Sequence, residues 1–155
     1  MNKRIERIRR RLIGIVLRSG IKAQVVVVPV PAERPKASWD YRIRRIKVSV
    51  GHEPQISPIC MLLHELGHAA HEHSPFTWET YYRCPDEVLN RESDAWKWAF
   101  RFNAQHKVVP EILLIDATVW GYSTYLERIE RIRESEAKIK AKSFAVAQTE
   151  LYRAV

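Results

Sequence analysis

The sequence predicts an α+β domain, because strand-forming and helix-forming stretches both occur and lie in separate parts of the chain. Two segments rich in β-branched residues, Ala23–Val30 and Tyr41–Val50, fall in the N-terminal third. Most of the remaining chain repeats apolar residues at helical spacing. A chain of 155 residues, 46% of them hydrophobic, is long enough to bury one core. We therefore expect a single domain over residues 1–155, with a small twisted sheet and several helices.

Residues 2–18 are expected to form a basic amphipathic helix. Arginines fill the face opposite to its apolar positions, which recur at helical spacing. Those apolar positions are Ile5, Ile8, Leu12, Ile15 and Val16. The pair Ser19-Gly20 is typical of a helix end, so residues 1–20 are assigned to this N-terminal element.

Two strands are expected to follow this helix. The first is Ala23–Val30, and the proline-containing stretch Pro31–Asp40 after it is predicted to be a loop. In Tyr41–Val50 the apolar residues change phase near Arg44-Arg45, so a bulge or a tight turn is expected there. The segment Ile46–Val50 is either an ordinary paired strand or an exposed edge to which an extended substrate adds.

The most informative stretch is His64-Glu65-Leu66-Gly67-His68, within a helix predicted over about 58–73. His64 and His68 are four residues apart, so both imidazoles project from one helix face and can share one metal ion. Glu65 lies about 100° further round the helix, where it can accept a proton from a water molecule activated by that ion. The stretch therefore predicts a hydrolytic zinc site.

A catalytic zinc ion usually has three protein ligands, so a third residue is needed. The longer zinc motif would require glycine at His71 and histidine at Ser74, and it is absent. Glu92 is the better candidate, because it interrupts the apolar stripe of the following helix, where an unpaired carboxylate is costly. A partly buried acid paired with an arginine is the alternative for Glu92. The expected metal ligands are His64, His68 and Glu92, with Glu65 as the catalytic base.

Other residues near this motif are expected to act outside the set of metal ligands. His71 and His73 are expected to end the helix or to lie outside the metal ligands, and Asp94 is expected to face away from Glu92. The donor to the developing oxyanion is left open among several side chains. They are Tyr81, Tyr82, Tyr122, Tyr125 and His71. Gly67 is expected to let another chain segment pack close beside the metal.

The C-terminal part is expected to be helical. One helix runs from Pro85 to about His106, a second covers 110–120, and a long third one rich in i,i+4 ion pairs starts near Tyr125. Residues 123–155 are therefore assigned to a C-terminal helical extension. The aromatic-rich stretch Phe76–Cys84 is expected to be irregular.

The net charge of +8 is unevenly distributed. Residues 1–50 hold 14 of the 26 basic and three of the 18 acidic residues, which gives +11, and the remainder carries −3. A basic half of this kind suits nucleic acid, an acidic partner or a membrane surface, and a solvated basic face is the alternative. The apolar run Leu12–Leu17 is too short for a signal peptide or a membrane span. Two unpaired cysteines complete the expectation of a soluble cytoplasmic protein.

The motif and the segment after it resemble the gluzincin metallopeptidases, and they are most similar to the ImmA/IrrE-type domain. The resemblance covers roughly residues 40–122. It rests on the run His64–His68, Glu92 with Ala95, Trp98-Ala99, and Val108-Val109-Pro110. The asparagine or aspartate that follows the alanine in the family is Trp96 here, and the histidine that often follows the motif is shifted, with His71 and His73 flanking its place.

This resemblance implies a zincin-like fold and a zinc-dependent endopeptidase. It transfers zinc ligation to His64, His68 and Glu92 and the base role to Glu65. Family members often inactivate helix-turn-helix repressors, which implies a protein or peptide substrate and gives the basic N-terminal half a reason to lie near DNA.

Two other functions are compatible with the same residues. A DNA-associated protease of the SprT-like kind also combines this motif with basic surfaces, but it usually draws its third ligand from a histidine. A non-proteolytic binding or sensing module would hold zinc with four protein ligands and use the long C-terminal helix as its partner surface.

Overall fold

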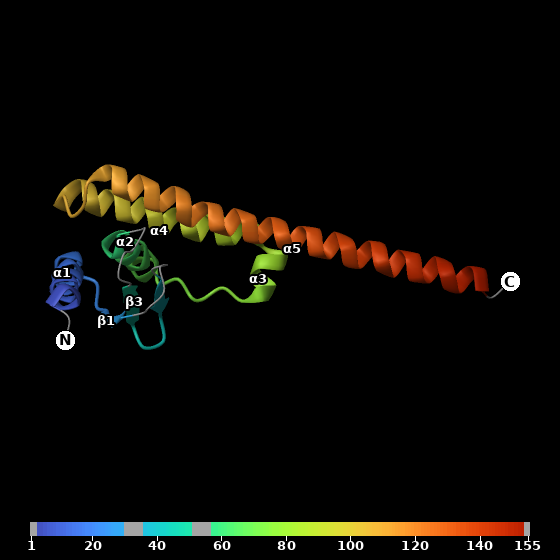
Figure 1. Ribbon diagram of the computed structural model, residues 1–155, viewed down its shortest axis with the longest axis horizontal. Coiled ribbons are helices and arrows are strands. Elements are labelled where there is room, and N and C mark those ends of the chain that lie inside the picture. The colour runs from blue at the N-terminus through green and yellow to red at the C-terminus, as the bar shows by residue number, and fades with distance from the viewer. Residues whose placement is uncertain (1–2, 30–35, 51–56, 154–155) are drawn as a thin grey trace.

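The computed structural model describes residues 3–29, 36–50 and 57–153, and it has the expected α+β architecture (Figure 1). Within these residues lie five helices and one three-stranded sheet. In chain order the elements are α1 (Lys3–Ser19), β1 (Gln24–Pro29), β2 (Ala37–Asp40), β3 (Arg45–Val50), α2 (Pro58–Ala70), α3 (Trp78–Arg83), α4 (Pro85–His106) and α5 (Glu111–Arg153). Residues 31–35 of the predicted loop Pro31–Asp40, and residues 51–56 between the second predicted strand and the motif helix, lie outside the described residues.

The sheet has the strand order β1-β3-β2, so β3 is its central strand. β3 pairs in parallel with β1 and antiparallel with β2. The hypothesis of an exposed edge at Ile46–Val50 is therefore wrong, and the ordinary paired strand is correct. Its residues Ile46, Val48 and Val50 are buried, whereas Arg45 and Lys47 face solvent, which is the alternation of a strand with one covered face.

The segment after the first strand differs from the prediction. Residues 37–40 form strand β2 instead of a loop. Of the two expected interruptions near Arg44-Arg45, the tight turn is confirmed and the bulge is not: residues 41–44 form the turn of a β2–β3 hairpin, so Tyr41 and Ile43 lie outside the strands. The backbone N–H of Arg42 donates to Asp40 Oδ1 (3.1 Å), and Arg44 adopts a left-handed conformation with φ 50°. The phase change in the sequence therefore marks a reversal of the chain.

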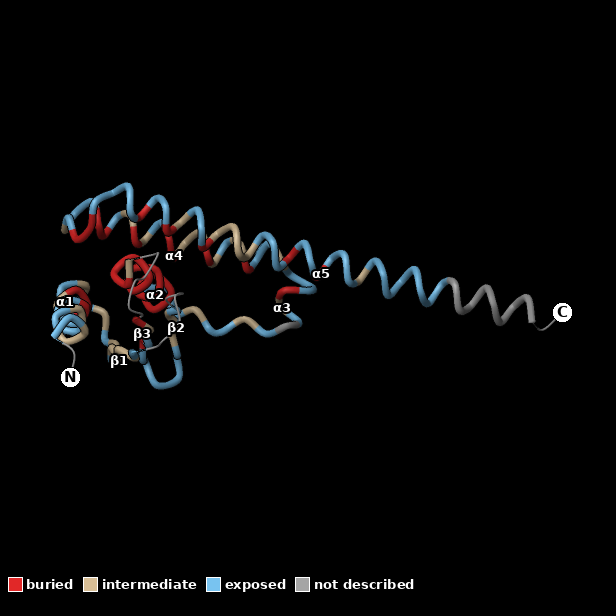
Figure 2. Tube along the Cα trace, in the orientation of Figure 1, coloured by how far each residue is buried: buried red, intermediate tan, exposed pale blue. Residues whose placement is uncertain are grey.

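Helix α2 is buried on nearly every side (Figure 2). Twelve of its 13 residues are buried, because the sheet, α4 and α5 surround it. Ser57 caps its start by accepting a hydrogen bond from the backbone N–H of Ile59, and Pro58 occupies the first helical position, as predicted. The helix ends at Ala70 rather than near His73, because Glu72 turns the chain with φ 52°.

A short helix, α3, occupies part of the stretch expected to be irregular. Thr77 caps it, since its hydroxyl accepts a hydrogen bond from the backbone N–H of Thr80. α3 brings Tyr81 into a small apolar cluster that also contains Val88 from α4 and Ile129 and Ile132 from α5. This cluster fixes one wall of the cleft described below.

Helices α4 and α5 run antiparallel beside each other and cover α2 (Figure 1). α4 has the predicted extent, but the two helices predicted over 110–120 and from Tyr125 are one continuous helix of 43 residues. Gly121 does not interrupt it and packs against Trp96 instead. The part of α5 beyond Glu136, its projecting half, extends away from the body, and its described side chains, residues 137–144, are exposed (Figure 2). No described helix is long and apolar enough to cross a bilayer.

Candidate metal centre

The site is built where α2 crosses α4 at very close range. A Cβ atom added to Gly67 would lie 2.6 Å from Ala95 Cα and 2.7 Å from Ala95 C, so only glycine allows this approach. The expectation that Gly67 admits a close neighbour beside the motif is confirmed. The crossing places Glu92, one helical turn before Ala95, directly against the two histidines of α2.

The three expected ligands come together. His64 Nε2 lies 2.9 Å from Glu92 Oε2, and His68 Nε2 lies 3.3 Å from Glu92 Oε1. One ligand atom from each of His64, His68 and Glu92 lies within 4.8 Å of the other two. Such spacing fits three ligands bound at about 2.0–2.2 Å to one ion. The described part of the chain thus contains a buried group that could bind a metal ion.

The burial of Glu92 and the two histidines favours a bound cation between them. Glu92 is completely buried, and its Oε1 completes no hydrogen bond with any described residue. His64 and His68 are only 5% and 8% exposed. A buried carboxylate needs a positive partner, and a bound metal ion would satisfy the free oxygen and both imidazoles at once. The alternative in which Glu92 pairs with an arginine is wrong, because its partners are histidines.

The charges of this group influence one another strongly. Burial would lower the pKa of His64, but its contacts with Glu65 and Glu92 outweigh this and raise the pKa to about 9. Burial would raise the pKa of Glu92, but the hydrogen bond from His64 and the charges of both imidazoles lower it to about 2. Without metal, the site is therefore held together by a protonated imidazole beside a carboxylate. A metal ion would have to displace that proton.

His73 contacts one of the candidate ligands from outside the group. Its Nδ1 lies 3.0 Å from His68 Nδ1, so the two rings share a hydrogen bond through the nitrogen of His68 that faces away from Glu92. Burial, together with the charges of His68 and His71, lowers the pKa of His73 to about 4. A neutral His73 can accept the His68 N–H and fix its orientation. His71 lies at the exposed end of α2.

Trp96 forms the other side of the site. Its indole stacks on the His64 imidazole, with the ring centroids 4.3 Å apart and the planes 25° apart. Trp96 is 3% exposed and is held from behind by Gly121, where an added Cβ would lie 2.8 Å from the indole ring. Trp96 therefore packs directly on a candidate ligand.

Glu65 faces a cleft of about 260 Å³ beside the metal group. Its Oε1 lies 3.5 Å from His64 Nδ1, and the cleft is also lined by His68 and Glu92. The remaining walls come from β2, from the segment after α2, and from α3 and α5. A substrate entering this cleft would meet the predicted base and two of the predicted ligands together.

Two of the candidate oxyanion donors, Tyr81 and Tyr125, line this cleft. Burial and the nearby negative charge of Glu92 raise the pKa of Tyr125 well above its usual range, so its hydroxyl stays protonated. Arg128 donates to the Tyr81 hydroxyl at 3.0 Å and lies over both rings. Tyr82 instead bonds to Glu136, and Tyr122 lines a different groove.

Sequence reasoning missed three contributors to the site. Strand β2 was predicted to be a loop, and Arg128 lies on α5, 60 residues after His68. Trp96, which packs on His64 outside the cleft, was predicted only to depart from a pattern. Thr77, a capping residue before an aromatic-rich stretch, was a local signal for α3. Asp94 forms an ion pair with Lys97 and is not among the metal group, and Cys84 is an exposed free thiol.

No protein-family model, curated protein or solved structure matches this chain.

Proposed function

We propose that this protein is a zinc-dependent endopeptidase with a zincin-like fold. The observation that carries the proposal is the buried group of His64, His68 and Glu92, with Glu65 beside it in an open cleft. Two imidazoles and one carboxylate are a ligand set that zinc uses in hydrolytic enzymes, with one position left for water. The ligand types and their spacing both support zinc.

The chain supplies the acid–base groups that peptide hydrolysis needs. When bound, zinc lowers the pKa of a water molecule and polarises a carbonyl group. Glu65 takes up the proton of the attacking water on one carboxylate oxygen and later delivers it to the leaving amine. The Tyr125 hydroxyl, kept protonated by its surroundings, is suited to donate to the developing oxyanion.

The cleft is suited to an extended peptide. β2 is an edge strand that pairs with β3 on one side, and its residues Ala37, Ser38 and Trp39 line the cleft. No strand of the described chain pairs with its other edge. A substrate that adds to this edge would have its backbone held by main-chain hydrogen bonds beside Glu65. The edge predicted for substrate binding is thus assigned to β2 in place of β3.

The decisive experiment compares Glu65→Gln with the wild type. We expect the variant to keep one equivalent of zinc, measured by elemental analysis, and to lose peptide cleavage in a mixed-peptide digest read by mass spectrometry. Glu72→Gln is the matched control, since Glu72 lies just after the end of α2, is 79% exposed and, among the described residues, pairs with Arg44 alone. Undiminished cleavage by Glu65→Gln would contradict the proposal.

A second pair of measurements separates the proposal from its two alternatives. We expect Glu92→Ala to lose zinc, because one of three ligands is removed. Retained zinc in this variant would favour a histidine-ligated, DNA-associated protease. X-ray absorption that showed four protein ligands and no open position would favour a non-proteolytic binding or sensing module.

We further propose that the substrate is a regulatory protein bound to DNA. The support is the basic surface: α1 carries seven basic residues and one acid, and the β2–β3 turn and β3 expose further arginines and a lysine. Duplex DNA binding that weakens steeply with salt is the expected result in an electrophoretic or anisotropy assay. Binding that salt leaves unchanged would remove the support.

A further inference from the structure

A second groove lies between the outer surfaces of α4 and α5. It has a volume of about 620 Å³ and shares no lining residue with the metal cleft. The α4 side is formed by Ser93, Trp96, Lys97, Phe100 and Arg101, and the α5 side by Thr118 and Tyr122. These residues recur at three- and four-residue intervals, so each helix presents one continuous face to the groove.

The rim of this groove on α5 carries exposed apolar side chains. Ile115 and Val119 stand beside Thr118 and Tyr122 on the helix surface and are 41% and 62% exposed. Ile112 continues the same line by one turn and is 60% exposed. Large apolar residues in one row on a surface are costly in water unless a partner covers them. No element of the described chain covers this row.

The floor of the groove contains an unsatisfied polar atom. Trp96 lines the groove and is 3% exposed, yet its indole Nε1 has no hydrogen-bond partner among the described residues. Buried indole N–H groups usually find an acceptor. This N–H is itself buried beneath the groove surface, so the apolar row and the basic side chains form the contact surface of the groove.

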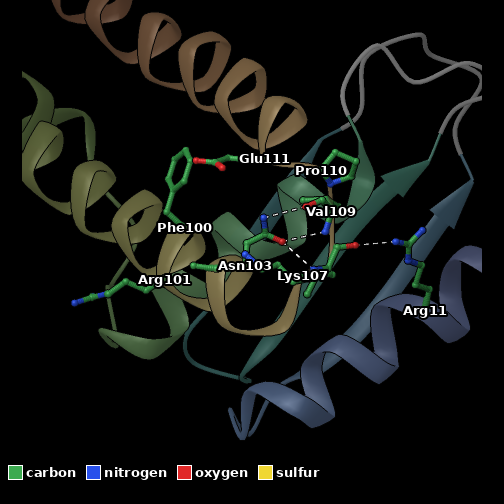
Figure 3. A pocket seen from close by; sticks show the side chains of 10 residues that line it. Arg11, Phe100, Arg101, Asn103, Lys107, Val109, Pro110 and Glu111 are labelled. Carbon is green, nitrogen blue, oxygen red and sulfur yellow. Dashed lines mark hydrogen bonds between the residues drawn. The ribbon is translucent and has the colours of Figure 1, made fainter.

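The charged residues around the groove are mostly basic. Lys97 and Arg101 lie one turn apart on its α4 side. Lys97 forms an ion pair with Asp94 at 3.5 Å, whereas Arg101 forms no ion pair within the described residues. The groove adjoins a second cavity of about 800 Å³, with which it shares Phe100 and Arg101 (Figure 3). Arg11 and Lys107 line that cavity together with one acid, Glu111. An occupant with an acidic flank would complement this rim.

We propose that the α4–α5 groove docks an amphipathic helix of a partner protein, with apolar residues on the groove side and acidic residues toward Lys97 and Arg101. Two neighbouring antiparallel helices with a hollow between them can receive a third helix by ridge-into-groove packing. The projecting half of α5 from a second copy is a poor occupant, because its described part mixes acids and bases and is not acidic. A partner in this groove leaves the metal cleft accessible.

The test uses a phage-displayed library of helical peptides of about 18 residues, long enough to span the groove. Apolar positions sample aliphatic residues, and flanking positions sample Glu, Gln and Lys. The library is selected on the full chain, and enriched peptides are measured by fluorescence anisotropy. We expect glutamate-flanked peptides to be enriched and to bind at least about tenfold more weakly to Val119→Glu and to K97E/R101E.

Matched controls come from the same long helix. Ile139→Glu places the same charge at a residue of similar exposure, 66%, outside the groove, and K138E/K142E reverses two exposed lysines one turn apart. Binding to both controls should be unchanged. Failure to enrich any binder, a preference for lysine flanks, or binding indifferent to Val119→Glu would overturn the proposal. Sedimentation showing a dimer that Val119→Glu dissociates would overturn it in favour of a second copy.

Discussion

Glu92 shows how a single residue is stabilised by its surroundings at this site. Its carboxylate is fully buried on a helix whose neighbouring stripe positions are Val88, Ala95 and Ala99, and it is tolerated because His64 and His68 face it. Removing either partner would leave an unpaired buried charge, which is strongly destabilising. The same contacts make the site sensitive to protons, because metal and proton compete for His64.

The apparent zinc affinity is therefore expected to rise with pH. The pKa of His64 in the metal-free protein is about 9, so zinc must release one proton from it at lower pH. The pKa of Glu92 is about 2, so Glu92 releases none near neutrality. Affinity should increase by about tenfold per pH unit between pH 6 and about pH 9 and then level off. Calorimetry in buffers of different ionisation enthalpy counts the protons released when zinc binds. Zero release at pH 7 would contradict a protonated His64 in the metal-free protein.

Trp96 is expected to hold His64 in the orientation that binds metal. Trp96→Ala removes the stacked indole and should weaken zinc binding by about 10–100-fold, whereas Trp96→Phe keeps an aromatic face and should lose much less. Trp98→Ala is the control, because Trp98 lies on the same helix but stacks on Phe102. Chelator competition measures affinity, and far-UV circular dichroism verifies folding. Equal losses in the alanine variants at 96 and 98 would mean that the effect is one of general stability.

At the level of elements, the crossing of α2 and α4 determines whether the site exists. The two helices approach so closely at Gly67 that an added methyl group would overlap the Ala95 backbone. The histidines and Glu92 belong to different helices, so a small separation of the helices moves the third ligand away from the other two. Metal binding at this group would therefore depend on how closely the two helices pack at the crossing.

Gly67→Ala should push helices α2 and α4 apart. Backbone atoms of α4 cannot move aside easily, so we expect a loss of about 1–3 kcal/mol or more in the free energy of unfolding, together with weakened zinc binding. Gly14→Ala in α1 is the matched control, because nothing lies within 4 Å of the added Cβ, and better helix propensity should stabilise by about 0.5–1 kcal/mol. Urea unfolding measures both. A neutral Gly67→Ala would show that the helices can separate without cost.

At the scale of the whole molecule, the long helix α5 has a first half that packs on the body and a projecting half that does not. Its first half supplies Leu114 and Ala117 to the main core and Ile129 and Ile132 to the second cluster. Beyond Glu136, whose carboxylate bonds to Tyr82 and Lys140, the described side chains are exposed. The projecting half therefore adds helical residues but no described side chain to the hydrophobic core.

Truncations of α5 should show this division. Ending the chain after Lys140 should lower the helical circular dichroism signal yet shift the melting temperature by no more than about 2 °C, because no described buried side chain is removed. Ending it after Leu126 removes two buried isoleucines and Arg128, and should cost several kcal/mol and the cleft wall. Differential scanning calorimetry distinguishes them. Similar destabilisation by the two truncations would mean that the projecting half packs on the body.

Sequence periodicity predicted α1, α2 and α4, because each has strong local signals at its ends: Ser19-Gly20, Ser57-Pro58 and Pro85. It failed where local signals were weak or misleading. The four-residue strand β2 has little pattern of its own and exists because β3 pairs with it. The phase change at residues 41–45 was visible, but only the pairing of the two arms showed that it is a hairpin turn.

The sequence by itself determined the residue types of this candidate site: two histidines one turn apart, a glutamate beside them, and a second carboxylate on an apolar stripe as the third expected ligand. Helical spacing determines which side chains share a face, so these inferences need only one helix at a time. Tertiary structure alone decided that Glu92 reaches both histidines, that Trp96 stacks on one of them, and that β2 forms the rim of the cleft. These facts depend on contacts between elements distant in the chain, and the spacing of residues within one helix or strand carries no information about such contacts.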